Sequence, residues 1–176
     1  MTAYGSLHII ITGPYASGKT TLMRSLCGLP PAPPESNQIV RPWVPHAQWK
    51  PQVMIHPIAW AALSPDLAVW CLETPGARRF DYMWQTFAEH RLGFIITLDS
   101  AKPETFRECK SILETFRAYD PVPHVVAATR ADHPDAWSVE DLDLALRLNG
   151  SVPIIPVDAR QRVDVIPVAN LLAGMI

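Results

Sequence analysis

The chain has 176 residues, a formal net charge of −2 and 18% charged residues, which suits one domain with a single buried core. It has no cluster of basic residues, and this excludes a nucleic-acid-binding surface. No apolar run approaches the roughly 18 residues of a membrane span, and the N-terminus lacks a signal-peptide pattern. We therefore expect one domain over residues 1–176, without a transmembrane segment and located in the cytoplasm.

The first strong signal is a phosphate-binding motif between an apolar run and a helical pattern. Residues 7–12 are rich in isoleucine and predict a buried strand, whereas residues 19–27 place apolar side chains at helical spacing. Between them stands Gly13-Pro14-Tyr15-Ala16-Ser17-Gly18-Lys19-Thr20, which matches G-x-x-x-x-G-K-[ST]. In such a loop the glycines let backbone amides approach phosphate. Lys19 reaches the outer phosphates, and the Thr20 hydroxyl ligates Mg²⁺.

Proline is concentrated in the next stretch, residues 29–51. Its density excludes a helix or a central strand and predicts a long loop. Directly after a phosphate-binding helix, this is where a nucleotide-sensing switch would lie, although a surface excursion without a switching role is the alternative. Trp43, Trp49 and Trp60 are expected to be packing anchors, and exposed tryptophans there would instead favour a partner surface.

The rest of the chain alternates between predicted strands and helices. Residues 53–62 and 67–73 predict an antiparallel hairpin around Ser64-Pro65-Asp66. A helical pattern then carries Phe80, Met83, Trp84 and Phe87. Further strands are predicted at 92–98, 122–128 and 152–157.

Three more helices are predicted between and after these strands. Pro103 opens the first, with an apolar stripe of Phe106, Cys109, Ile112, Leu113 and Phe116. Ser138 and Asp141 predict a capping box for the second, and Gly150 is expected to end it. The last helix is predicted over residues 165–173, with Pro167 in its first turn.

This order of elements predicts an α/β three-layer fold with a mostly parallel six-stranded sheet and one antiparallel edge strand. The carboxyl ends of parallel strands meet at one edge, where such sheets bind their ligands. Four polar or glycine-containing segments follow strands and should gather there: residues 13–20, 73–76, 129–132 and 158–160.

In order and spacing these segments resemble those of a P-loop NTPase of the Ras-like G-domain kind, across essentially the whole chain. Gly13-Pro14 followed by Ser17-Gly18-Lys19-Thr20-Thr21 looks like the bacterial MglA-like (gliding-motility) GTPases. Thr74-Pro75-Gly76, with Arg79-Phe80 and Tyr82-Met83-Trp84, looks like the related conservon-type GTP-binding proteins of actinobacteria.

The resemblance implies which residues contact the nucleotide. Thr129-Arg130-Ala131-Asp132 is similar to the guanine-specifying motif, in which the Asp132 carboxylate would accept two hydrogen bonds from guanine and Arg130 would cover the base. Asp158-Ala159-Arg160 is similar to the last base-contacting loop, where the Ala159 amide would donate to guanine O6. The implied nucleotide-binding residues are Gly13, Tyr15, Ala16, Ser17, Gly18, Lys19, Thr20, Thr21, Gly76, Thr129, Arg130, Asp132, Asp158, Ala159 and Arg160.

Several residues depart from the family pattern around the γ-phosphate. Thr20 and Glu73 are the implied Mg²⁺ ligands, but Glu73 replaces the usual aspartate and adds a methylene. Ala77 stands where the family has the glutamine that orients water. No threonine lies between Thr21 and Thr74 to sense the γ-phosphate, and Tyr15 could obstruct an arginine supplied by a partner. Intrinsic GTP hydrolysis should therefore be very slow or absent.

Lys19 and Arg78 are the residues expected to act on the transferring phosphoryl group, with Arg41 and Arg79 near the same predicted switches. The leading hypothesis is a switch that binds GTP or GDP with Mg²⁺ and whose hydrolysis is weak or depends on a partner. The resemblance implies a roadblock-domain protein as that partner. The alternatives are a pseudo-GTPase scaffold with little or no hydrolysis and an ATP-dependent P-loop kinase, which would leave Asp132 without a role.

Overall fold

The computed structural model describes residues 5–31, 58–65, 67–74, 92–118 and 122–176. The Pro-rich stretch after residue 31 and the predicted helix carrying Phe80 and Trp84 lie outside these ranges. The strands are β1 (Gly5–Thr12), β2 (Ile58–Ser64), β3 (Leu67–Glu73), β4 (Leu92–Asp99), β5 (His124–Thr129) and β6 (Ile154–Val157). The helices are α1 (Lys19–Leu26), α3 (Phe106–Ala118), α4 (Val139–Leu146) and α5 (Arg162–Ala173), with a 3₁₀ turn η1 (Pro103–Thr105).

The six strands form one sheet in the order β2-β3-β1-β4-β5-β6. Strand β2 runs antiparallel to β3 at one edge, and all other neighbours are parallel. The predicted fold class, with its antiparallel edge strand, is thus confirmed. Because β1, β3, β4, β5 and β6 are parallel, their carboxyl ends share one side of the sheet.

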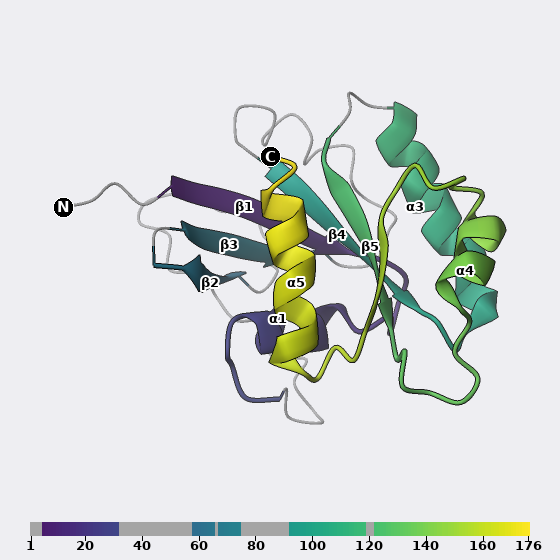
Figure 1. Ribbon diagram of the computed structural model, residues 1–176, viewed down its shortest axis with the longest axis horizontal. Coiled ribbons are helices and arrows are strands. Elements are labelled where there is room, and N and C mark those ends of the chain that lie inside the picture. Colours follow the sequence, from purple (N-terminus) through teal and green to yellow (C-terminus); the bar gives the residue numbers. More distant parts are fainter. Residues whose placement is uncertain (1–4, 32–57, 66, 75–91, 119–121) are drawn as a thin grey trace, which may run out of the picture.

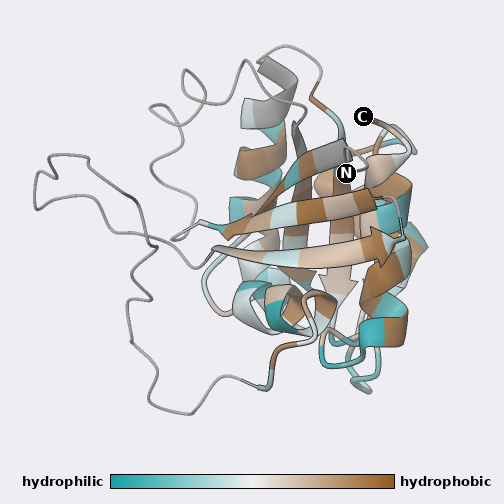
Figure 2. Cartoon of the chain, turned by 90° about the vertical axis from the view of Figure 1, so that its left-hand side faces the viewer, coloured by the Kyte–Doolittle hydropathy of each residue, from teal (hydrophilic) through white to brown (hydrophobic). Residues whose placement is uncertain are grey.

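Helices cover both faces of the sheet, so the fold has three layers (Figure 1). On one face α1 and α5 pack on β1, with Leu22 and Val168 in the same buried cluster as Ile9 and Ile11. On the other face α3 and α4 pack over Ile10 and the alternate residues of β4 and β5. Brown apolar residues run along the strands in Figure 2, as expected for strands buried on both faces.

Two helix ends differ from the sequence predictions. Helix α4 ends at Leu146, because Arg147 adopts a left-handed conformation with φ 55° and Leu148 turns back into the core. The predicted stop, Gly150, lies beyond the end and donates its N–H to the Asp143 side chain. Ser138 is the predicted cap of this helix, and its Oγ accepts the Asp141 N–H at 3.1 Å.

Helix α5 begins at Arg162, three residues before the predicted start at residue 165. Pro167 therefore lies inside the helix and not in its first turn. Proline has no backbone N–H, so Pro167 cannot donate the helical hydrogen bond to the Val163 carbonyl. Because Val163 lies on the solvent side of the helix, the cost of the missing hydrogen bond is small. Strand bounds also shift: β6 begins at Ile154 and not at residue 152, and β2 extends to Ser64.

Candidate functional site

A cleft of about 960 Å³ opens at the carboxyl ends of β1, β3, β5 and β6. Segments that are far apart in the chain line it, and they are the four that the sequence predicted would gather there. The lining residues are Tyr15, Ala16, Ser17, Gly18, Lys19, Thr20, Thr21, Glu73, Thr74, Thr129, Arg130, Asp132, His133, Asp158, Ala159 and Arg160. Every described residue of the predicted nucleotide site is among them except Gly13.

Gly13 lies beneath the cleft, where the chain turns out of β1. Its φ is +144°, and a Cβ there would stand 2.3 Å from the Thr97 carbonyl oxygen, so only glycine fits. Gly18, with φ +91°, caps the start of α1 without a side-chain hydrogen bond. The first amides of α1 are therefore donors at the positive end of the helix dipole, facing the cleft.

Lys19 is 92% buried at the base of this loop, with 8% of its surface exposed. Its Nζ donates to the carbonyls of Gly13 at 3.0 Å and Pro14 at 2.7 Å. Burial lowers the pKa of Lys19, and the nearby carboxylates of Glu73 and Glu108 oppose that shift. The ammonium group thus stands at the centre of the loop, where it can exchange carbonyl contacts for phosphate oxygens.

Thr20 and Glu73, the two predicted metal ligands, contact each other. Thr20 Oγ1 donates to Glu73 Oε1 at 2.5 Å, which joins the start of α1 to the end of β3. Glu73 Oε2 is buried and, among the described residues, accepts no hydrogen bond. Burial raises the pKa of Glu73, whereas the Thr20 hydroxyl and Lys19 lower it. The site therefore holds an unpaired carboxylate oxygen beside a hydroxyl, which are the hard oxygen ligands that Mg²⁺ prefers.

A buried network of hydroxyl groups ties the phosphate loop to the neighbouring strands. Ser17 Oγ lies 2.6 Å from Thr97 Oγ1 on β4 and donates to the Pro14 carbonyl at 2.8 Å. Thr129 Oγ1, at the end of β5, donates to the Ser17 carbonyl at 2.9 Å. The loop of residues 13–20 and the loop that carries Asp132 are thus held at a fixed separation.

The far side of the cleft carries three charged side chains in contact. Arg160 Nη2 donates to Asp132 Oδ2 at 2.7 Å and to Asp158 Oδ2 at 2.8 Å, while Nε donates to Asp158 Oδ1. The hydrogen bond from Arg160 is the main reason that the pKa of Asp158 is lowered, with burial opposing it. Asp132, Asp158 and Arg160 therefore form one unit made from two loops.

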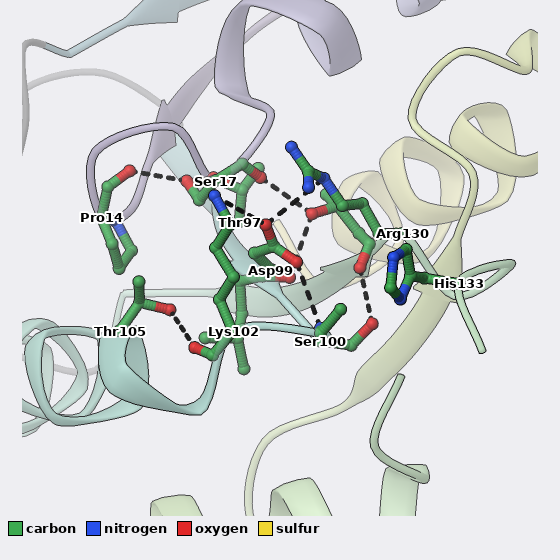
Figure 3. A network of polar contacts seen from close by, with 12 residues as sticks. Pro14, Ser17, Thr97, Asp99, Ser100, Lys102, Thr105, Arg130 and His133 are labelled. Atoms are coloured by element: carbon green, nitrogen blue, oxygen red, sulfur yellow. Dashed lines mark hydrogen bonds and ion pairs between the residues drawn. The ribbon is translucent and has the colours of Figure 1, made fainter. Parts of the chain in front are cut away.

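Sequence reasoning missed Asp99, which follows the apolar run of β4 at the same sheet edge. Its side chain is 1% exposed, and Oδ2 lies 3.3 Å from Arg130 Nε and 3.8 Å from Lys102 Nζ. Figure 3 shows both cationic side chains directed toward this carboxylate. The sequence did indicate Asp99 as a candidate. It ends an apolar run typical of a parallel strand, and the carboxyl ends of parallel strands lie at the edge of the sheet where ligands bind.

Some predicted site residues cannot be placed. Gly76 and Arg78 lie outside the described residues, as do Arg41, Ala77 and Arg79. The tryptophans at 43, 49 and 84 lie outside them as well. Trp60 is described, and it is 58% exposed opposite Trp70, which is 43% exposed. Within the described ranges, no helix is long and apolar enough to cross a membrane.

The comparisons with known proteins concern the fold. No family model matches the chain, and no curated protein matches it. Among solved structures, it is similar to the Arl6 (BBS3) small GTPase from Trypanosoma brucei with the bound nucleotide analogue GppNp. The TM-score is 0.69 and the identity 18%, with 97% of each chain covered. The chain has the fold of a Ras-like small GTPase.

Proposed function

We propose that this protein binds guanine nucleotides with Mg²⁺ and works as a molecular switch, as a single small GTPase-like domain over residues 1–176. The observation that carries the proposal is the cleft itself. It unites the loop with the phosphate-binding motif, a carboxylate oxygen of Glu73 that accepts no hydrogen bond from the described residues, and the Asp132 carboxylate on one surface. The structural likeness to a small GTPase that was solved with GppNp supports the same conclusion.

The phosphate end of the site rests on α1 and the loop before it. Amides at the start of α1 and the Lys19 ammonium group present positive charge to one point. A diphosphate or triphosphate there would offer oxygens in place of the Gly13 and Pro14 carbonyls that Lys19 now contacts. Tyr15, 88% exposed at the loop tip, and Thr21 border the same opening.

The purine end rests on Asp132 and the loop of Ala159. Guanine presents two N–H donors on one edge, and a carboxylate accepts both, whereas adenine presents a lone pair and a donor that do not match. The backbone N–H of Ala159 would donate to guanine O6. Arg130 and Arg160 flank the base position, and Thr129 fixes its distance from the phosphate loop.

Thr20 and Glu73 would hold Mg²⁺. Mg²⁺ held there would neutralise part of the negative charge of the phosphates. The buried Oε2 of Glu73 is consistent with this, because it accepts no hydrogen bond from the described residues and a buried polar atom without a partner is costly.

The residues around the γ-phosphate position favour a second candidate, a pseudo-GTPase scaffold. Ala77 and the missing threonine between Thr21 and Thr74 support slow hydrolysis, or hydrolysis that needs a partner. The contact of Thr20 with Glu73 is compatible with a bound metal, because the hydroxyl donates its proton to Glu73 and keeps its lone pairs for Mg²⁺. Lys19 and Arg78 are the residues proposed to act on the γ-phosphate when hydrolysis occurs.

The finer parts of the proposal rest on motif resemblance. We propose a relationship with the bacterial MglA-like and conservon-type proteins, a roadblock-domain partner and a cytoplasmic location. The exposed cross-strand pair of Trp60 and Trp70 supports a protein partner, because two large exposed aromatic side chains on an edge hairpin are typical of interface cores.

The test has two steps. Nucleotide released from the purified protein by heat and separated by anion exchange should be GDP or GTP, and ATP or ADP would support the kinase alternative. Asp132→Asn should then shift preference from guanosine toward xanthosine nucleotides, measured by displacement of a fluorescent GDP. Asp135→Asn, an exposed change in the same loop, is the matched control. An unchanged preference in Asp132→Asn would remove Asp132 from the base site.

A further inference from the structure

Arg160 bridges two carboxylates that come from different loops. Its Nη2 donates to Asp132 Oδ2 at 2.7 Å and to Asp158 Oδ2 at 2.8 Å, and its Nε donates to Asp158 Oδ1 at 2.8 Å. Because both Oδ2 atoms contact one nitrogen, the two carboxylates are close neighbours. Without the guanidinium group their like charges would repel.

The Asp158 end of the bridge is anchored to the protein. Asp158 is only 17% exposed at its side chain, and its Oδ1 also accepts the Arg160 backbone N–H at 3.0 Å. The backbone N–H of Asp158 donates to Asp164 Oδ2, in the first turn of α5, at 3.1 Å. Arg160 therefore extends from a fixed turn toward a carboxylate that is 52% exposed.

Exposed ion pairs usually contribute little, but a two-pronged arginine in a network of charges is the exception. The planar fork of arginine can hold Asp158 with two nitrogens and still reach a second carboxylate, which the point charge of lysine cannot do. The contact takes one lone pair of Asp132 Oδ2. A carboxylate has about four such sites, so both N–H donors of a guanine edge can still be accepted.

Building on the proposed function, we propose that Arg160 is a positioning residue: it screens Asp132 from Asp158 and holds the Asp132 carboxylate in the orientation that reads the guanine edge. The Asp132 side chain is then ordered before the nucleotide binds, so the free-energy cost of ordering it does not reduce the affinity. Arg160 therefore contributes both to affinity and to the recognition of the exocyclic amine of guanine.

The experiment measures displacement of a fluorescent GDP by unlabelled GDP and by IDP, which lacks the exocyclic amine, in Mg²⁺ buffer. Arg160→Ala should weaken GDP binding roughly tenfold and IDP binding less, so that the GDP/IDP ratio shrinks. Arg160→Lys keeps the charge and should recover only part of this loss. Arg107→Ala, an exposed arginine of α3 away from the cleft, is the charge-matched control. Thermal melts confirm that each variant is folded.

The Asp158→Asn substitution distinguishes two possible roles of Arg160: screening Asp132 from the charge of Asp158, and simply stacking on the base. In the wild-type background it should weaken GDP binding, because Arg160 loses its anchor. In the Arg160→Ala background it should strengthen GDP binding, because the repulsion on Asp132 disappears. Equal losses for GDP and IDP in Arg160→Ala, or no such change of sign, would overturn the inference. A wild-type protein that binds no guanine nucleotide would contradict the proposed function itself.

Discussion

The carboxylate of Asp99 lies against the side chain of Arg130, with Oδ2 3.3 Å from Nε, while Asp99 is 1% exposed and Arg130 is 51% exposed. Arg130 has a left-handed backbone with φ 57°, which turns its side chain back over the end of β4. A buried carboxylate thus anchors the residue proposed to cover the base.

Asp99→Asn should weaken GDP binding about threefold to tenfold, because Arg130 loses its charged anchor and orders less readily. The asparagine keeps an acceptor for the Ala101 N–H, which Asp99 Oδ1 accepts at 3.1 Å, so the free energy of unfolding should fall by only about 1 kcal/mol. Displacement of fluorescent GDP and urea unfolding give the two values. A loss of stability with unchanged affinity would mean that Asp99 serves the fold alone.

Gly13→Ala should abolish nucleotide binding and lower the free energy of unfolding by about 3 kcal/mol. The added Cβ would stand 2.3 Å from a backbone oxygen that cannot move without disturbing β4. Gly28→Ala is the control, since Gly28 also has a positive φ, +66°, but a Cβ there meets nothing within 4 Å. It should cost about 1 kcal/mol and leave binding intact. Equal effects in the two variants would contradict the tight approach at Gly13.

Thr129→Val should lower the free energy of unfolding by about 1–2 kcal/mol and weaken nucleotide binding. The single hydroxyl proton is shared between the Ser17 carbonyl, 2.9 Å from Oγ1, and the Leu98 carbonyl, 3.2 Å from Oγ1, and valine removes this donor. Thr115→Val, on α3, removes a hydroxyl that donates within its own helix, to the Ser111 carbonyl. If Thr115→Val lowered stability as much, the link between the two loops would contribute nothing of its own.

The three free thiols should react at different rates. A hydrogen bond from Cys71 lowers the pKa of Cys27, assisted by Arg162 and opposed by burial, whereas burial raises the pKa of Cys109 to about 12. Because the thiolate is the reactive form, Cys27 should be labelled first at pH 8 and Cys109 only after unfolding. Mass spectrometry of a timed alkylation identifies the order. Labelling of Cys109 at the rate of Cys27 would show that the core around α3 opens readily.

Local chemistry explains what could be predicted from the sequence. The loop of residues 13–20 could be predicted between a strand and a helix, because glycine, lysine and threonine at this spacing are typical of a phosphate-binding motif. Ser138 was identified as a helix cap from its spacing to Asp141. The alternation of strands with helices predicted a mostly parallel sheet, and the turn at Ser64-Pro65-Asp66 predicted the antiparallel hairpin. The spatial order of the strands was not predicted.

Tertiary context decided the rest. A glycine predicted the end of α4, but Arg147 accepted the left-handed conformation because Leu148 gains burial immediately after it. The bridge from Arg160 to Asp132 joins residues on separate loops, and no spacing along the chain indicates that they meet. The contact of Asp99 with Arg130 depends in the same way on the pairing of β4 with β5.

Calorimetric titration of the wild-type protein with GDP, GTP, ADP and ATP in Mg²⁺ buffer tests the central claim most directly. The account predicts one site for GDP and GTP, with at least roughly hundredfold weaker binding of the adenine nucleotides, because Asp132 matches only the guanine edge. Equal heats for guanine and adenine nucleotides, or no heat with any of the four, would contradict it.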